Sequence, residues 1–204
     1  MVTVLSESIT YSWKEVRAPK KITYDDFQLI PYDGLGHHLI KGVHIITPAP
    51  SSKHQWVSTK LSRLLGNFLE KNNVGEVIVA PYDVKFSEDS GFQPDLIIIE
   101  KENYKKIKQN YFDGVPLLII EILSPGSKRN DYVWKREMAE EYKVPEYWVF
   151  NIEEKLVDLF YLEEEKYVSK TFEKNQKLVS TLEKLQGLEI ELQELFDSLK
   201  MVEE

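Results

Sequence analysis

The stretch Val115-Pro-Leu-Leu-Ile-Ile-Glu-Ile-Leu123 decides the fold, because it is the most apolar run in the chain and holds one charged residue, Glu121. The turn-forming residues Ser124-Pro125-Gly126 follow it directly. A short apolar run that ends at turn residues is typical of a strand with both faces buried, as in sheets covered by helices. We therefore predict a central buried strand over residues 115–123, with a carboxylate inside it.

The segments around this strand predict a mixed sheet flanked by helices. Helical periodicity is clear over 51–71 and again from 130 or 131 to 143. The first of these helices should bury a stripe made of Trp56, Leu61, Leu64, Leu65, Phe68 and Leu69. Further strands are expected at 38–47, 76–86, 95–100, 146–151, 156–161 and 166–172. A turn is expected at 88–91, and a lysine-rich, partly helical connection at 101–113. Two more helices are expected, a short capped helix at 23–29 and an amphipathic helix at 190–202. This order of elements indicates an α/β or α+β domain.

Length and composition favour one domain. The chain has 204 residues, 42% of them hydrophobic, which is enough for a packed core. We place the domain at 22–197, between an N-terminal extension at 1–21 and a C-terminal tail at 198–204. The start of the chain lacks the features of a signal peptide, and no apolar stretch is long enough to span a membrane. Cysteine is absent, which agrees with a reducing compartment, so we expect a soluble cytoplasmic protein.

The net charge of −8 counts against a general nucleic-acid binder, because such proteins usually carry a basic surplus that attracts phosphates. Local basic clusters could still contact phosphates, although each by itself is more typical of solvated loop charges. The clusters are Lys101, Lys105, Lys106 and Lys108, and separately Lys128 with Arg129.

Two carboxylates stand where a buried strand would not normally carry them. Glu121 interrupts the apolar run, and Asp95 opens another buried strand immediately after Pro94. An ionised carboxylate in such a place is costly unless it is paired, hydrogen-bonded or bound to a metal. If the two strands are neighbours, both groups converge at one end of the sheet. Oxygen ligands of this kind favour Mg²⁺ or Mn²⁺.

A lysine on the following helix completes the candidate site. Positions 131, 135, 138 and 142 share one helical face, and this face carries Asp131, Lys135, Met138 and Tyr142. An ammonium group on an inward-facing stripe needs anionic neighbours, and the candidates are Asp131, Glu121 and Asp95. Close to a phosphate, Lys135 could stabilise developing negative charge or help to orient the attacking water.

A purely structural interpretation stays open for each residue. Asp95 could cap a turn, Glu121 could lie at an open strand edge, and Lys135 could extend to solvent. Other residues receive no role in the site: His37 is expected at the surface or hydrogen-bonded, and His54 begins the first long helix. The same holds for Asp83 and Asp89 at strand ends or turns, and for the core or interface aromatics Trp134, Tyr147 and Trp148.

A series of short motifs resembles one bacterial family. The motifs, in order, are Pro50-Ser-Ser-Lys-His-Gln55, Gln93-Pro-Asp-Leu-Ile-Ile-Ile99, Leu118-Ile-Ile-Glu-Ile-Leu-Ser-Pro125, the helix with Lys135, Val144-Pro-Glu-Tyr-Trp-Val149 and Gly187-Leu-Glu-Ile-Glu-Leu192. Together they resemble the Uma-type family of “putative restriction endonucleases”, placed in the PD-(D/E)XK nuclease superfamily. The likeness runs from about residue 23 to 196 and is specific in its order. It implies a restriction-endonuclease-like fold with its site at a forked edge of the central sheet.

The resemblance also implies roles for individual residues. Asp95 matches the aspartate of the family motif, and Glu121 matches the second acidic position. The superfamily usually has a lysine two residues after this acid, where Leu123 stands here, so Lys135 on the next helix supplies it instead.

One segment departs from the family pattern. Relatives usually carry acidic residues where this chain reads His38-Leu-Ile-Lys-Gly-Val43, so that His38, Lys41 and Val43 each replace an acid. The change implies weaker metal binding, a shift towards Mn²⁺ or a degenerate site. Because histidine can coordinate metal, His38 is the expected secondary metal ligand beside Asp95 and Glu121.

Three classes of function remain open at this level. The leading prediction is a metal-dependent endonuclease that acts on nucleic acid, DNA rather than RNA. The second is a catalytically silent nuclease fold that serves as a binding or scaffold module. In this case its Trp and Tyr residues and its C-terminal helix would form a protein interface, as in a homodimer. The third is a glycosidase with paired carboxylates, which would leave Lys135 unexplained.

Overall fold

A six-stranded mixed sheet forms the centre of the protein. The computed structural model describes residues 21–31, 33–124 and 126–202. The strand order is β11-β10-β9-β8-β6-β3, and only the pair β8 and β9 is parallel among the pairs of this sheet. The strands are β3 (Gly75–Val79), β6 (Leu96–Glu100), β8 (Leu118–Ile122), β9 (Glu146–Asn151), β10 (Leu156–Glu163) and β11 (Lys166–Glu173). The predicted central strand is therefore β8, with sheet neighbours on both sides.

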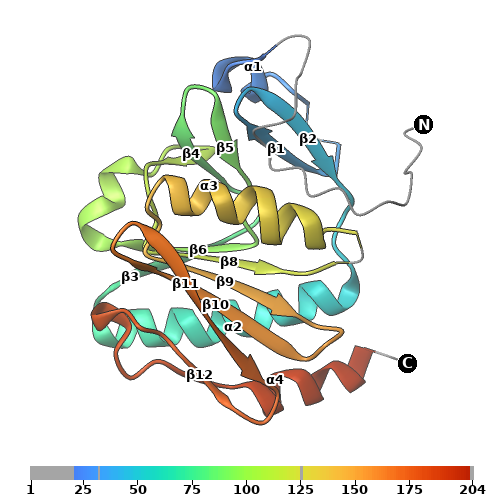
Figure 1. Ribbon diagram of the computed structural model, residues 1–204, viewed down its shortest axis with the longest axis vertical. Coiled ribbons are helices and arrows are strands. Elements are labelled where there is room, and N and C mark those ends of the chain that lie inside the picture. The colour runs from blue at the N-terminus through green and yellow to red at the C-terminus, as the bar shows by residue number, and fades with distance from the viewer. Residues whose placement is uncertain (1–20, 32, 125, 203–204) are drawn as a thin grey trace.

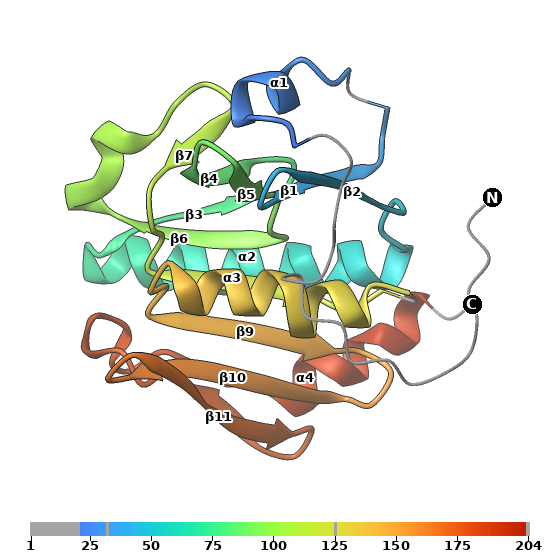
Figure 2. The same ribbon diagram turned by 45° about the horizontal axis from the view of Figure 1, so that its top comes forward.

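A second sheet of five strands lies beside the first, at the end of the molecule that carries α1 (Figure 2). Its order is β2-β1-β5-β4-β7. The strands are β1 (Gly36–Ile40), β2 (Val43–Thr47), β4 (Asp83–Ser87), β5 (Ser90–Phe92) and β7 (Tyr111–Asp113). A small two-stranded sheet of β12 (Lys177–Val179) and β13 (Glu189–Glu191) completes the strands.

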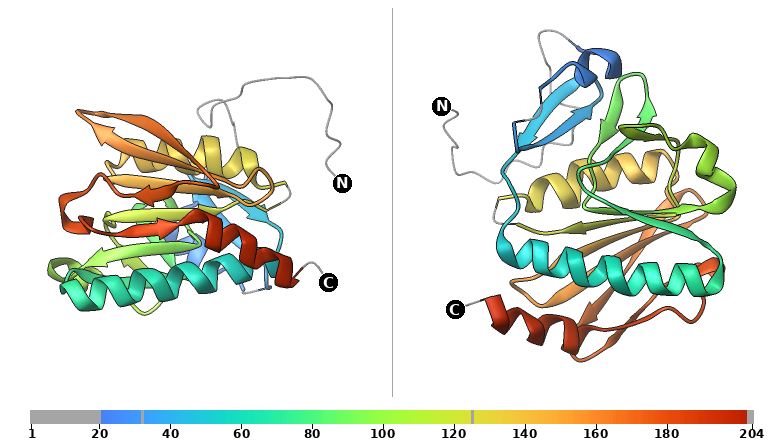
Figure 3. Two further views of the ribbon diagram at one scale, coloured as in Figure 1. Left: turned by 90° about the horizontal axis from the view of Figure 1, so that it is seen from below. Right: turned by 180° about the vertical axis from the view of Figure 1, so that it is seen from behind.

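Helices cover both faces of the main sheet, as expected (Figure 1 and Figure 3). On one face lie α2 (Ser52–Asn72), α4 (Leu192–Asp197) and the 3₁₀ helix Ser198–Val202. On the other lie the π-helical turn Asn130–Lys135 and α3 (Arg136–Glu141), which continue one another. A short helix α1 (Tyr24–Gln28) and 3₁₀ helices at Lys101–Lys106 and Glu183–Leu185 complete the set. No helix in the described ranges is both long and apolar enough to cross a membrane.

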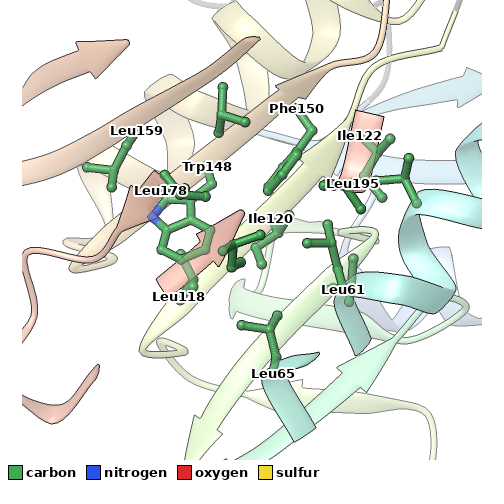
Figure 4. Packing of buried hydrophobic residues seen from close by; sticks show 14 of the residues in the cluster. Leu61, Leu65, Leu118, Ile120, Ile122, Trp148, Phe150, Leu159, Leu178 and Leu195 are labelled. Carbon is green, nitrogen blue, oxygen red and sulfur yellow. The ribbon is translucent and has the colours of Figure 1, made fainter. Parts of the chain in front are cut away.

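Side-chain alternation along the strands divides the core into two layers. Ile98, Ile120 and Trp148 face α2, whose buried residues Val57, Leu61, Leu65 and Leu69 belong to the same core cluster. Figure 4 shows Leu61 and Leu65 of α2 in this cluster with Ile120 and Trp148 of the sheet. Ile97, Ile119 and Tyr147 face the opposite side, towards Met138 and Ala139 of α3. Glu121 is two residues from Ile119, so it lies on the α3 side, which is the side that carries Lys135.

The helix termini follow the signals in the sequence. Thr23 and Asp26 form a reciprocal capping box at the start of α1, as expected. Ser51 caps α2 by accepting a hydrogen bond from the backbone N–H of His54. At its other end Asn73 adopts a left-handed conformation that ends the helix.

Two predicted strands are wrong as single elements. Residues 38–47 form the hairpin of β1 and β2, because Lys41 and Gly42 both adopt positive φ and reverse the chain. Residues 76–86 are divided between β3 and β4, which belong to different sheets and are separated by the Pro81 segment. The apolar composition is correct in both cases, but it does not reveal where a chain changes sheet.

The buried stripe of α2 also differs from its prediction at one residue. Leu65 is 0% exposed in the core, whereas Leu64, which we expected in the same stripe, is 41% exposed. We expect Leu65→Ala to lower the free energy of unfolding by about 2–5 kcal/mol, because it leaves a cavity under the sheet. The matched variant Leu64→Ala should change it by less than about 0.5 kcal/mol. Urea denaturation of both variants checks this; equal losses would contradict the assigned helix face.

The expected C-terminal tail at 198–204 is mostly described, whereas the expected N-terminal extension at 1–21 is not. Leu199 is buried in the main core, and Trp56 of α2 donates a hydrogen bond to Ser198 Oγ at 3.0 Å. The first part of the expected C-terminal tail therefore packs on the domain. The expected N-terminal extension lies outside the described residues except for Lys21.

Candidate active site

A cavity of about 220 Å³ opens between the hairpin of β1 and β2 and the neighbouring ends of β6 and β8. It brings together residues that are far apart in the sequence. The ionisable side chains that line it are His38, His54, Asp95, Glu121, Asp131 and Lys135.

Asp95 and Glu121 lie on neighbouring strands, as expected. β6 and β8 are antiparallel with Leu96 opposite Ile120, which places Asp95 level with Glu121. Oδ2 of Asp95 accepts a hydrogen bond from the backbone N–H of Ile122 at 2.7 Å. Glu121 is 1% exposed, and its Oε1 has no hydrogen-bond partner within the described residues. The pair thus presents a buried, unsatisfied carboxylate oxygen at the cavity.

Lys135 turns inwards and is held by two carboxylates. Its Nζ lies 2.8 Å from Glu121 Oε2 and 2.9 Å from Asp131 Oδ1, and the residue is only 5% exposed. The predicted partners Asp131 and Glu121 are confirmed, and extension of the lysine to solvent is excluded. The π-helical turn from Asn130 to Lys135 sets this geometry, and such turns are frequent at functional sites.

Burial and charge act in opposite directions on this cluster. Burial raises the pKa of Glu121 well above its usual value, although the nearby Lys135 opposes the shift. Burial lowers the pKa of Lys135, but the carboxylates of Asp131, Glu121 and Asp95 outweigh it and raise that pKa above the usual value. Lys135 is therefore cationic, and three carboxyl groups share this one positive charge. A divalent cation would supply the positive charge that the cluster lacks.

His38 lies in the cavity wall with both ring nitrogens engaged. Its Nδ1 accepts a hydrogen bond from the backbone N–H of Gln93 at 3.3 Å, and its Nε2 donates to Thr47 Oγ1 at 3.1 Å. Burial lowers the pKa of His38 well below its usual value, and Lys135 adds to this effect. The ring is thus neutral and has no free lone pair in this arrangement. Its role as a metal ligand stays a prediction that requires the bond from Gln93 to break.

His54 is the site residue that sequence analysis did not assign. It lies in the first turn of α2 and is buried, with Nε2 at 3.0 Å from Asp95 Oδ2. One signal could have found it, because positions 54, 57, 61 and 65 share one face of the helix. A histidine on the same face as Val57, Leu61 and Leu65 must lie against the sheet.

Asp83 is also buried, behind the cavity wall, although sequence analysis gave it no role. Its carboxylate accepts hydrogen bonds from Tyr24 Oη at 3.1 Å, Gln93 Nε2 at 3.2 Å and Gln28 Nε2 at 3.4 Å. Gln93 in turn precedes the Pro94-Asp95 pair at the start of β6. Asp83 therefore anchors the segment that leads into the site.

We expect a pH-dependent effect of Asp83 on stability. Burial raises its pKa above the usual 3.8, although the hydrogen bonds from Gln93, Tyr24 and Gln28 oppose this. The folded state then binds the proton more tightly than the unfolded state, so stability is lost as pH rises through the folded pKa. The stability of Asp83→Asn should rise relative to that of the wild type between about pH 3 and pH 7. Urea denaturation across this range tests it, and a pH-independent difference would contradict it.

The remaining candidates have structural surroundings. His37 is half-buried between Asp33 and His44, and Asp89 accepts hydrogen bonds from Ser87 and Ser90 in a turn. Tyr147 and Trp148 are fully buried core residues, so they offer no surface for a partner. Within the described ranges, no three histidine or acidic side chains are arranged as a metal site.

The class of protein follows from this arrangement. The central mixed sheet lies between helices, which is the architecture of the restriction-endonuclease-like fold. A crystal structure of a “putative nuclease belonging to DUF820” from Anabaena variabilis ATCC 29413 shares this fold with a TM-score of 0.76. It is 19% identical, and the match covers 87% of this chain and 99% of that chain.

The family is established by the sequence match. The Uma2 family model, described as “Putative restriction endonuclease”, matches residues 24–193, and the chain belongs to this family. No curated protein matches the chain. The resemblance found in the short motifs is confirmed, and family and fold together support a nuclease.

Proposed function

We propose that this protein is a divalent-metal-dependent endonuclease that hydrolyses phosphodiester bonds in DNA, with Asp95, Glu121 and Lys135 as its active-site residues. One observation carries the proposal. Two carboxylates from neighbouring strands and a buried lysine meet in one cavity, and Glu121 Oε1 has no partner there among the described residues. A buried oxygen of this kind is costly unless a ligand satisfies it.

The donor set fits Mg²⁺ or Mn²⁺. Asp95 and Glu121 would hold the cation through carboxylate oxygens, which both ions prefer. When bound, such an ion lowers the pKa of a coordinated water and neutralises charge on a phosphate. His38 remains a proposed secondary ligand, conditional on release of its bond from Gln93.

The protein's own residues supply position and charge. Asp131 and Glu121 fix the Lys135 ammonium at the cavity, where it would stabilise the negative charge that develops on a phosphate during hydrolysis. The Ile122 N–H holds the Asp95 carboxylate in place. Because Lys135 keeps its charge through the neutral range, it acts as an electrostatic group and does not transfer the proton.

A cleavage assay tests the proposal directly. Supercoiled plasmid, linear duplex DNA, single-stranded DNA and RNA are incubated with the wild type in Mg²⁺, Mn²⁺ or EDTA. We expect DNA cleavage that requires the cation and that falls by about 10²–10³-fold in Glu121→Gln. The matched control is Glu154→Gln, which changes an exposed partner of Lys128 and should cleave like the wild type. Cleavage in EDTA, or full activity of Glu121→Gln, would contradict the proposed mechanism.

A second candidate is a catalytically silent nuclease fold that serves as a binding or scaffold module. The engaged nitrogens of His38 and the net charge of −8 favour it. Its test is DNA binding at increasing salt, because phosphate contacts lose affinity steeply as salt rises. Absence of DNA binding at low salt, together with absence of cleavage in any cation, would support this candidate over the first.

A homodimer remains a proposal, and some of the residues expected at its interface are buried within the protein. Tyr147 and Trp148 lie in the core, and α4 directs Leu192, Leu195 and Phe196 into the same molecule. A glycosidase is disfavoured, because the family is described as one of nucleases and Glu121 forms an ion pair with Lys135.

A further inference from the structure

The first turn of α2 places His54 beside the carboxylate of Asp95. Ser51 caps the helix through the backbone N–H of His54, and this fixes the start of the helix beside the cavity. The side chain of His54 is buried and lines the same cavity as Asp95.

The hydrogen bond between these side chains has one possible direction. An ionised carboxylate can only accept, so His54 Nε2 must carry the hydrogen that bridges the 3.0 Å to Asp95 Oδ2. The same oxygen accepts from the backbone N–H of Ile122 at 2.7 Å. Two donors from different elements thus engage Oδ2, which leaves Oδ1 as the oxygen that can take a cation.

The second ring nitrogen of His54 does not help to hold the ring in place. His54 Nδ1 is buried and has no hydrogen-bond partner in the described part of the chain. A buried histidine with a structural role usually has both nitrogens satisfied, as His38 does. Asp95 is therefore the one hydrogen-bond partner of the His54 side chain among the described residues.

We propose that His54 is a positioning residue that orients Asp95 for metal binding through its Nε2–H donor. This inference rests on the proposed function, because it assumes that Asp95 takes a cation. A donor behind a metal-binding carboxylate fixes its rotamer and reduces the number of orientations that a cation must select. Loss of the donor should weaken metal binding without altering the ligands themselves.

The experiment measures Mn²⁺ binding by calorimetric titration of the full chain without any substrate. His54→Leu removes the donor and should raise the dissociation constant by about 10–100-fold. His54→Gln places an amide N–H close to the position of Nε2 and should restore binding to within a few-fold of the wild type. His44→Gln is the matched control, since His44 is a half-buried histidine outside the cavity, and it should bind like the wild type.

The outcomes separate this inference from the proposed function. Wild-type affinity in a folded His54→Leu would overturn the role of His54 and leave the metal site standing. No binding by the wild type would overturn the metal site and the role of His54 together. If His54→Leu does not fold, His54→Asn replaces it, because its amide is too short to reach Asp95; weakened binding then supports the role, and wild-type affinity overturns it.

Discussion

Asp95→Asn is expected to lose divalent-cation binding and DNA cleavage together. The substitution keeps the size of the side chain but replaces the carboxylate, so the two donors at Oδ2 meet a neutral amide and the cation loses a charged ligand. Mutation of a residue that hydrogen-bonds to a metal ligand typically lowers metal affinity or activity by about 10–100-fold. Loss of the ligand itself should therefore lower both by more than about 100-fold. Calorimetric titration of Mn²⁺ and plasmid cleavage measure the two effects on the same preparation.

The control for this prediction is Asp89→Asn. Asp89 is also an aspartate near a strand end, but its side chain accepts hydrogen bonds from Ser87 and Ser90 in a turn away from the cavity. It should bind Mn²⁺ and cleave DNA like the wild type. Retained cleavage in Asp95→Asn at the wild-type rate would exclude the proposed mechanism.

Lys135→Met should reduce both cleavage and stability. The substitution keeps most of the side-chain volume, but it removes the charge that Glu121 and Asp131 share. Removal of one electrostatic group from an active site costs about 10²–10³-fold in turnover. Breaking a buried ion pair by deleting one partner costs about 3–5 kcal/mol in the free energy of unfolding, because the remaining charges are left uncompensated.

A surface lysine provides the comparison. Lys128 forms an ion pair with Glu154 at 2.9 Å, but both side chains are exposed, so Lys128→Met should lose less than about 1 kcal/mol. Urea denaturation gives the stabilities, and cleavage is compared only under conditions in which both variants are folded. Equal stability losses would show that burial does not strengthen the Lys135 cluster, and unchanged cleavage in Lys135→Met would remove Lys135 from the site.

The pKa of Lys135 sets the pH range of this contribution. Its folded pKa lies above the usual 10.5, so the folded state holds the proton more tightly than the unfolded state. The stability contributed by Lys135 is therefore fully present below the unfolded pKa and is lost only as pH rises through the folded one. The stability difference between the wild type and Lys135→Met should persist across the neutral range.

Much of the local structure could be predicted because it depends on neighbouring residues. The periodicity of 51–71 predicted α2 to within one residue at each end, and the apolar run around Glu121 predicted β8. The capping box of α1 is a contact three residues apart. Such elements depend on short-range patterning, which a sequence displays directly.

The elements that were missed depend on which sheet a strand joins. Residues 76–86 are apolar enough for one long strand, but β3 pairs with β6 while β4 pairs with β5 and β7. Pro81 marks a break between β3 and β4, but the local composition does not show which sheet each strand joins. The hairpin at Lys41-Gly42 was missed because apolar residues continue on both sides of the turn.

By itself, the sequence determined the buried strands, the two long helices, the family and the unusual placing of carboxylates at Asp95 and Glu121. Each of these depends on composition, spacing or motif order. Only the tertiary structure decided that His54 bonds to Asp95 and that Asp83 lies buried behind Gln93. The physical reason is that these contacts join residues from separate elements, whose distances are set by sheet register and helix packing, and neither is encoded in any local stretch of the chain.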